Sequence, residues 1–460
     1  MKLLITAGKV MLFITGYLAL GYNLGSERLL PTADPLGLAL EKTGAYFRED
    51  LRRLDASLVN YVALAESPQV PVNDLRNAHL QARKDFKKVE YLLAYIEPAT
   101  VSLHLNGAPL PKTEPSVPEV NVIAPSGLQT LDELVFADEI DRKAILKVSK
   151  KLRRNYQQLQ KQLSWLRLQH RHVFEAMQEE VVRIFTLGLT GFDTPGSGAA
   201  LPEARVSLSN LRRVYQAYAP ALVEKDPAIN TSILAAFAVG EQQLTSDHFN
   251  EFDRLAFLRK VINPLTKNLP AARIALEIES SDDQSQLPAP THRQPQLLFD
   301  EDFLDAAYYA NLTESVNTEK RRELGELLFF DPVLSEDLTV SCASCHQPEM
   351  AFTDGYPKSL RATGEGTVLR NSPTLVNSVF AERYFYDLRE EFLERQMMHV
   401  VADEHEFATD FVTLETRLKM SEEYRRLFAE AYADQPKYQL SKWSISDAIS
   451  HYVASLQGLN

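Results

Sequence analysis

The sequence predicts an all-α fold, with an N-terminal helical bundle followed by a second helical domain towards the C-terminus. Apolar residues recur at helical spacings along much of the chain, whereas the alternation typical of strands is scarce. A polar, proline-rich segment also divides the chain. Because 460 residues are too many for one ordinary hydrophobic core, we expect two or three domains.

The first residues have the pattern of an export signal. Lys2 and Lys9 precede an apolar stretch from Val10 to Leu20. The small residues Ala19 and Gly21 are spaced as a cleavage site requires. Since this stretch is shorter than the roughly 20 apolar residues that span a bilayer, a signal peptide over residues 1–21 is favoured over an uncleaved anchor. The sequence thus predicts a periplasmic protein, attached to the inner membrane only if the leader is retained.

Residues 22–278 are predicted to form the helical bundle. Asp74 is placed to cap a helix that ends before Pro98, and the turn-rich residues 99–125 predict a loop. The histidines of this part lack metal-ligand partners at convincing spacing, so we interpret them as core or surface residues. They are His79, His104, His170, His172 and His248.

A long helix is predicted from about Asp141 to Leu187, where neither glycine nor proline interrupts an apolar stripe typical of a bundle core. Residues 195–202 indicate a hinge or loop, and a further helical stretch covers about residues 205–278. The polar, proline-rich residues 279–298 predict a linker. Residues 299–460 then form the second domain.

The chain contains two cysteines, and both belong to one Cys-x-x-Cys-His sequence. Two thiols at this spacing reach the two vinyl groups of one porphyrin edge, and the histidine that follows ligates the iron. Zinc would require a second pair of ligands, and a thioredoxin-like site would gain nothing from the histidine. The sequence therefore predicts one c-type haem, attached to Cys342 and Cys345 with His346 as the proximal iron ligand, in a protein that matures outside the cytoplasm.

The formal net charge of −13 argues against nucleic acid as a partner, because its phosphate groups would be repelled. An acidic surface keeps a protein soluble, and it would also attract a basic electron donor such as a small cytochrome. Of these two roles, solubility is the interpretation that we favour.

Four sequences around the haem motif occur in a characteristic order. They are GELLFFDPVLS at 325–335, AFTDG at 351–355, RNSPTLVN at 370–377 and FYDLR at 385–389. Together they resemble the bacterial di-haem cytochrome c peroxidase family, including its MauG branch, over about residues 303–460. The resemblance implies a haem enzyme that reduces hydrogen peroxide to water with electrons from a small cytochrome c or cupredoxin.

The resemblance also implies roles for particular side chains. Glu406 falls at the position of the family's distal glutamate, whose carboxylate moves a proton between the two oxygens of peroxide. Gln396 falls at the position of the distal glutamine, and Arg389 at that of a family arginine. Asn371 matches a residue whose side chain binds calcium between the two haem domains.

The sequence departs from the family pattern in three ways. Tyr386 stands where the family has a tryptophan between the haems, and it keeps an aromatic, redox-active side chain for electron relay. Residues 362–367 lack the histidine that caps the resting iron in many members, as in the MauG branch. The second haem domain of the family is absent from the sequence, and a helical pattern that runs to Leu459 leads us to expect a truncated chain.

Three other functions stay open. A MauG-like oxidase would withdraw electrons from a protein or small substrate through a high-valent haem, and the missing capping histidine favours it. A mono-haem electron-transfer cytochrome would need a second iron ligand. The candidates are Met397, Met398, His399 and His405. A haem-binding bundle protein would sense or dock without turnover.

Two segments of the N-terminal part, FKKVEYLL at 86–93 and GLQTLDELVF at 127–136, are similar to imelysin-like helical domains of exported bacterial proteins. The similarity assigns no catalytic residue.

Overall fold

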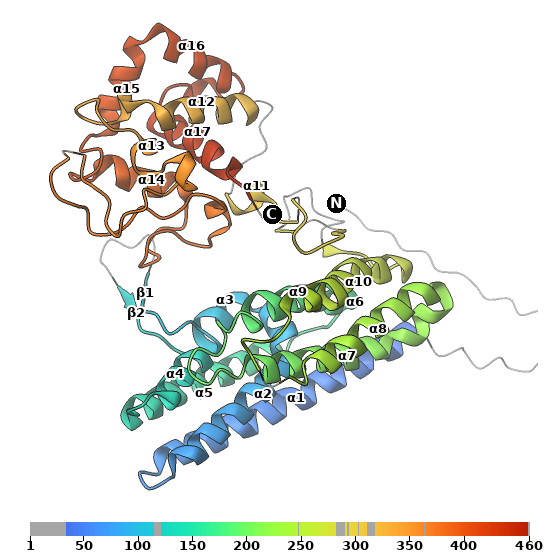
Figure 1. Cartoon of the computed structure of the whole chain (residues 1–460). Coiled ribbons are helices and arrows are strands. Elements are labelled where there is room, and N and C mark those ends of the chain that lie inside the picture. Colours follow the sequence, from blue (N-terminus) through green and yellow to red (C-terminus); the bar gives the residue numbers. More distant parts are fainter. Residues whose placement is uncertain are drawn as a thin grey trace, which may run out of the picture. The chain divides into compact units, whose positions relative to one another are not determined.

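The computed structural model describes residues 34–458, apart from residues 115–120, 247, 282–289, 292–293, 302, 311–317 and 363. The described residues are predominantly helical, which confirms the all-α prediction (Figure 1). One small antiparallel sheet occurs among them, in which β1 (Lys112–Thr113) pairs with β2 (Val122–Ile123). The predicted leader lies outside the described residues. Within the described ranges, we find no helix with the length and apolar character needed to cross a bilayer.

The N-terminal part consists of long helices packed around one hydrophobic core (Figure 1). Helix α2 packs against α1, α6 and α7, and α10 packs against α6 and α8. Short π-helical turns interrupt the regular helices among the described residues. The elements are α1 (Pro35–Glu66), α2 (Val72–Ile96), α3 (Pro98–Thr100), η1 (Val101–Leu105), α4 (Leu128–Phe136), α5 (Arg142–Leu163), α6 (His170–Arg183), η2 (Ile184–Gly188), α7 (Ala200–Lys225), α8 (Pro227–Gln243), α9 (Arg254–Phe257), η3 (Leu258–Ile262) and α10 (Asn263–Ala275).

The prediction of one long helix from Asp141 to Leu187 is wrong, because the structure has a break between α5 and α6. After the break, the Gln169 backbone N–H donates to Nδ1 of His172 at 3.3 Å, so that a side chain caps the first turn of α6. The start of this second helix depends on a polar cap rather than on glycine or proline, which is why the sequence pattern did not reveal it.

Two smaller predictions are also corrected. Asp74 lies within the first turn of α2, where it complements the helix dipole, and Pro71 occupies the cap position. Residues 99–125 are not a simple loop, because they contain η1 and the two strands. The predicted helix end before Pro98 is confirmed. The helical stretch expected over 205–278 is divided at Asp226, whose side chain accepts hydrogen bonds from two backbone N–H groups and caps α8.

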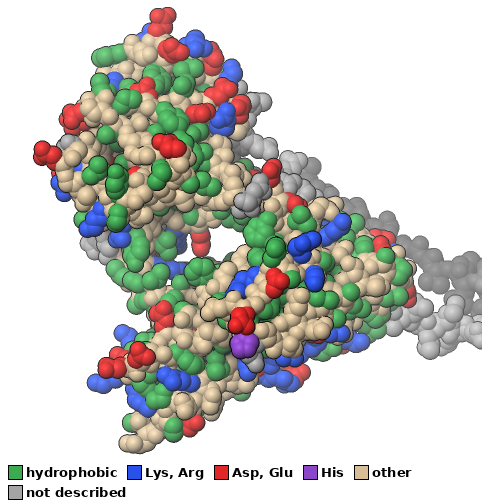
Figure 2. Space-filling view, in the orientation of Figure 1, with side chains coloured by type: hydrophobic (Ala, Val, Ile, Leu, Met, Phe, Trp, Pro, Cys, Tyr) green, Lys and Arg blue, Asp and Glu red, His purple; other side chains and the backbone are tan. Residues whose placement is uncertain are grey.

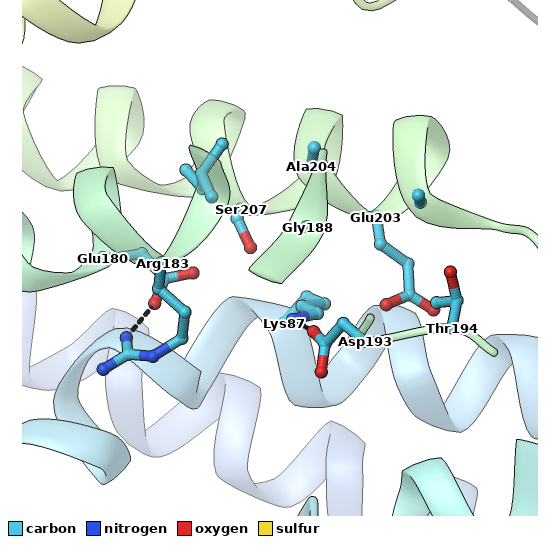
Figure 3. A pocket seen from close by; sticks show the side chains of 11 residues that line it. Lys87, Glu180, Arg183, Gly188, Asp193, Thr194, Glu203, Ala204 and Ser207 are labelled. Atoms are coloured by element: carbon cyan, nitrogen blue, oxygen red, sulfur yellow. Dashed lines mark hydrogen bonds and ion pairs between the residues drawn. The ribbon is translucent and has the colours of Figure 1, made fainter. Parts of the chain in front are cut away.

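Charged side chains form a network in the core of the N-terminal part. Arg83 is fully buried and donates to both carboxylate oxygens of Glu203, at 2.5 and 2.7 Å. Lys87 pairs with Asp193 (Figure 3). The Asp193 carboxylate also accepts from the Asn106 amide at 2.7 Å. Because a buried charge without a partner is strongly unfavourable, these pairs hold α2, α7 and the loop before α7 together.

The network encloses a cavity of only about 10 Å³, which is close to the space of one water molecule. Burial raises the pKa of Glu90 to about 7, although the neighbouring Lys87 opposes this shift. His79 lies at the edge of the same network and forms a hydrogen bond between Nε2 and Oδ1 of Asp132, at 3.1 Å. This histidine is therefore a core residue with a carboxylate partner.

The C-terminal part has a second hydrophobic core, built mainly between α12, α14 and α17. Its helices are α11 (Ala306–Tyr309), α12 (Thr318–Phe330), α13 (Cys342–Cys345), α14 (Leu393–Ala402), α15 (Phe411–Met420), α16 (Glu422–Ala431) and α17 (Lys442–Ser455). Long connecting segments between α13 and α14 follow the haem motif (Figure 1). Helix α17 ends at Ser455, so the helical pattern expected to reach Leu459 does not continue as a helix, and Leu459 itself lies outside the described residues.

Helices α12 and α17 approach each other at Gly325, the first residue of the GELLFFDPVLS segment. A Cβ atom added here would lie 1.9 Å from the backbone oxygen of Ala448. Glycine is therefore required by the close contact between the two helices rather than by its backbone conformation.

We expect the substitution Gly325→Ala to destabilise the C-terminal part by about 1–3 kcal/mol, since the added methyl group forces the two helices apart. Urea unfolding of the haem-loaded protein, followed by haem absorbance, measures this change. Gly458→Ala is the matched control, because a Cβ there meets the Val376 side chain at an ordinary 3.6 Å. Equal unfolding midpoints for the two variants would contradict the prediction.

Candidate haem site

The haem motif forms a single helical turn, α13, which places its two cysteines at the two ends of the turn. Both thiols are free and partly buried. Burial raises the pKa of the Cys342 thiol to about 12, and it also raises that of Cys345. Two separate, uncharged thiols on one turn, directly followed by an imidazole, fit the two attachment points and the proximal ligand of a c-type haem.

His346 is oriented by its neighbours. Its Nδ1 lies 3.0 Å from the backbone oxygen of Phe352 and 3.0 Å from Oγ of Ser372. Burial lowers the pKa of His346, so the ring is neutral. When Nδ1–H donates to the Phe352 oxygen, Nε2 carries the lone pair that an iron requires.

The chain must turn back sharply to bring the Phe352 oxygen to the histidine. Ala351 and Phe352 both adopt left-handed backbone conformations, with φ values of 53° and 58°. A bridge between Gln347 and Thr353 closes this turn. Backbone strain of this kind in residues other than glycine persists only where surrounding contacts require it. The AFTDG segment thus acts as a support for the proximal histidine.

Glu406 lies in the turn after α14, and its charge adds a minor contribution to the raised pKa values of the Cys342 and Cys345 thiols, for which burial is the main cause. Burial raises the pKa of Glu406 to about 7, with a further contribution from Asp403, while Arg389 opposes the shift. The turn is fixed on two sides: the Glu336 N–H donates to the Phe407 oxygen at 2.9 Å, and the Ala362 N–H donates to the His405 oxygen at 3.2 Å. A half-buried carboxyl group with this pKa is suited to accept and return a proton near neutral pH.

The FYDLR segment places its residues in two different surroundings. The Arg389 guanidinium lies 3.6 Å from the centre of the Phe385 ring and donates to Asp387 at 2.9 Å. Tyr386 is 71% exposed, and its ring is covered by the guanidinium of Arg370 at 4.3 Å. The structure therefore brings Arg389 into the electrostatic surroundings of Glu406, whereas Tyr386 lies at the surface.

The remaining predicted residues are more scattered. Gln396 is half-buried on α14, and Asn371 is exposed.

The four candidate second iron ligands also lie in different surroundings. Met397 is buried and its sulfur accepts from Ser446 at 3.6 Å. His399 forms a hydrogen bond with Glu390 at 3.0 Å. The other two candidate second ligands, Met398 and His405, are partly buried. Calcium binding by Asn371 and second ligation of the iron stay predictions.

Two residues of the site were missed by sequence reasoning. Ser372 lies 26 residues after His346, and nothing in that spacing indicates that its hydroxyl meets the imidazole. Asp354 acts electrostatically on both His346 and Cys345. Asp354 belongs to the AFTDG segment and Ser372 to the RNSPTLVN segment, both of which were identified as characteristic. That membership gave no role to either position.

Comparison with known proteins identifies the C-terminal part. Residues 319–460 match the family described as di-haem cytochrome c peroxidase. This segment belongs to the di-haem cytochrome c peroxidase family. The resemblance predicted from the sequence is thus confirmed, and the family implies c-type haem as the cofactor of the segment.

The relatives include members of both branches of the family. The di-haem peroxidase segment is 32% identical over 139 residues to the methylamine utilization protein MauG of Methylophilus methylotrophus, a match that covers 30% of this chain and 40% of the relative. It is 34% identical over 139 residues to the cytochrome c551 peroxidase of Pseudomonas aeruginosa, again covering 30% and 40% of the two chains. The cytochrome-c peroxidase IdrP2 of Denitromonas iodatirespirans is 32% identical over 142 residues, which are 30% of this chain and 37% of the relative.

Among solved structures, the chain is similar to a MauG-like protein associated with microbial copper homeostasis, with 28% identity and a TM-score of 0.30 over 39% of this chain and 47% of that chain. The chain therefore spans less than half the length of the relatives and of the structure named here.

Proposed function

We propose that this protein is an exported, periplasmic haem enzyme that reduces hydrogen peroxide to water with electrons from a small redox protein, a cytochrome c or a cupredoxin. The observation that supports this most strongly is Glu406, a half-buried carboxyl group with a pKa of about 7 whose charge contributes to raising the pKa values of both thiols of the haem motif. A leader that remains uncleaved would attach the enzyme to the membrane.

In this proposal, Cys342, Cys345 and His346 hold the haem, which supplies a redox-active iron for the two-electron reduction of peroxide. Reduction of one peroxide to two waters consumes two electrons and two protons. Glu406 accepts the proton from one peroxide oxygen and returns it to the other, so that the departing oxygen leaves as water. The Phe352 oxygen and Ser372 hold the His346 ring in place during this exchange.

We assign supporting roles to the other predicted residues. Arg389 places a positive charge close to the Glu406 carboxylate once the proton has left. Gln396 lines the peroxide side of the site. Tyr386 relays electrons at the surface, where Arg370 covers its ring. Asn371 contributes to a calcium site.

A MauG-like oxidase is the second candidate, because residues 362–367 contain no histidine to cap the iron. In that case, the protein would take electrons from a protein or small substrate rather than from a donor cytochrome. Single-turnover experiments with peroxide distinguish the two. A peroxidase takes two electrons from an added donor protein for each peroxide consumed. A MauG-like oxidase takes the same two electrons from its substrate, so one substrate molecule is oxidised by two electrons for each peroxide.

The proposed role of Glu406 predicts a specific pH dependence. The base is the carboxylate form, which is populated above the pKa of about 7. We therefore expect the rate of reaction between the haem-loaded protein and peroxide to rise as the pH increases from about 6 to 8, with its midpoint near the pKa of this group. Stopped-flow absorbance of the haem measures the rate. A profile that is flat over this range would argue against Glu406 as the base.

A further inference from the structure

We propose that a basic groove on the N-terminal part binds a phosphate ester. The groove lies between α2, α7 and the end of α8 and has a volume of about 550 Å³, within the range of small-molecule sites. Its cationic lining residues are Lys84 and Lys88 on α2 and Arg205 and Arg213 on α7. No acidic residue lines it among those that the structure describes.

The helical spacing of the lining residues gathers the four positive charges on facing surfaces. Lys84 and Lys88 are one turn apart on α2, and Arg205 and Arg213 are two turns apart on α7. The two helices are joined here by Asn210, which is buried on α7 and donates to the Lys88 backbone oxygen at 2.7 Å. The position of the charges is therefore set by the packing of α2 against α7.

Two of the four cations have no carboxylate partner among the residues that the structure describes. Lys84 and Arg205 are exposed and form no ion pair with any residue in the described part of the chain. The other two are paired with acids outside the lining: Lys88 with Asp85 at 2.9 Å, and Arg213 with the buried Asp50. The groove thus retains an uncompensated positive charge.

This local charge is opposite to that of the whole chain. The formal net charge is −13, and acidic and basic side chains are interspersed on the face drawn in Figure 2. A groove whose charged lining residues are all cations attracts anions, even in an acidic protein. The need for solubility explains the negative net charge of the protein, but it does not explain why positive charges gather in this groove.

The donors in the groove are suited to phosphate. Guanidinium groups bind phosphate oxygens in pairs, and the ammonium groups of lysine add positive charge. Thr245 also lines the groove, but its hydroxyl already donates to the Gln242 backbone oxygen at 2.7 Å. The apolar side chains of Val206 and Leu244 line it as well, and they suit the organic part of an ester. The Ser209 hydroxyl is less available, because it donates to Glu241 at 2.9 Å.

The test uses the full-length, haem-loaded protein and the double variant Lys84→Gln/Arg205→Gln. The control is Lys143→Gln/Lys147→Gln, which removes two exposed lysines of α5 and changes the net charge equally. Binding of glycerol 3-phosphate is measured by calorimetry. Binding to phosphatidylcholine vesicles, with and without phosphatidylglycerol, is measured by co-sedimentation.

We expect the wild type and the control to bind alike, and the groove variant to bind at least about tenfold more weakly, because two charge-assisted contacts are lost. Binding of glycerol 3-phosphate would identify a free phosphate ester, whereas binding only to vesicles with phosphatidylglycerol would identify a lipid headgroup. Absence of binding to both probes would overturn the proposal. Equal weakening of binding in the groove variant and the control would overturn it as well. Peroxide reactivity plays no part in this readout, so the proposal stands or falls independently of the proposed enzyme function.

Discussion

Replacing Glu406 by glutamine is expected to slow the reaction of the haem-loaded protein with hydrogen peroxide by about 100- to 10,000-fold. The amide keeps the size of the carboxyl group but accepts no proton near neutral pH, so only proton transfer is removed. The rate is measured by stopped-flow absorbance above the pKa of the wild-type carboxyl, where the carboxylate form prevails.

The control is Glu404→Gln, two positions earlier in the same turn. Its side chain is 85% exposed and lies 3.6 Å from His405. It removes the same charge from the same turn, so a general change in the electrostatics would slow both variants. We expect Glu404→Gln to retain the wild-type rate and its rise with pH, and Glu406→Gln to lose both. If Glu406→Gln reacts as fast as the wild type, the proton must be moved by another group.

The second large effect is expected in the N-terminal part, where Arg83→Met should lower the free energy of unfolding by about 3–5 kcal/mol. Methionine fills much of the space of arginine, but it leaves the carboxylate of Glu203 buried without its partner. Asn106 loses a donor as well, since Arg83 lies 3.3 Å from its side-chain oxygen. Urea unfolding followed by far-ultraviolet circular dichroism measures the change.

Two further variants identify the cause. Arg83→Met/Glu203→Leu removes both charges of the pair and should regain part of the lost stability, because no carboxylate is then left unpaired. Arg53→Met breaks a pair with Glu49 at the surface and should shift the midpoint little. A double variant no more stable than Arg83→Met would mean that packing, rather than the unpaired charge, causes the loss.

The fold class and the haem motif could be predicted from the sequence, since each rests on local spacing. The apolar period of 3.6 residues identified the helical parts, and the Cys-x-x-Cys-His sequence identified the attachment site. The break between α5 and α6 could not be predicted in this way, because it depends on how His172 caps the second helix. The buried pair of Arg83 and Glu203 could not be predicted either, because the two residues are far apart in the sequence and lie in different helices.

The chemistry around the haem motif was only partly predictable. The resemblance to a family pointed to Glu406, but the cause of its raised pKa is burial in a turn fixed by Phe407 and His405. The contact of Ser372 with His346 arises because the RNSPTLVN segment passes beside the proximal turn. The burial of Glu406 and the contact of Ser372 with His346 depend on segments that folding brings together. No local sequence pattern therefore predicts them.

The buried ion pairs of the N-terminal part also bear on how it folds. Arg83 and Glu203 are 120 positions apart, and Lys87 and Asp193 are 106 apart. Contacts between such distant positions form late, because the intervening loop must close first. Lys87 keeps a partner on its own helix, Glu90 at 2.5 Å, but until α7 packs in place Arg83 would be buried without the carboxylate of Glu203. We therefore infer that these helices cannot complete their core in succession, and that the N-terminal part folds as one cooperative unit rather than helix by helix.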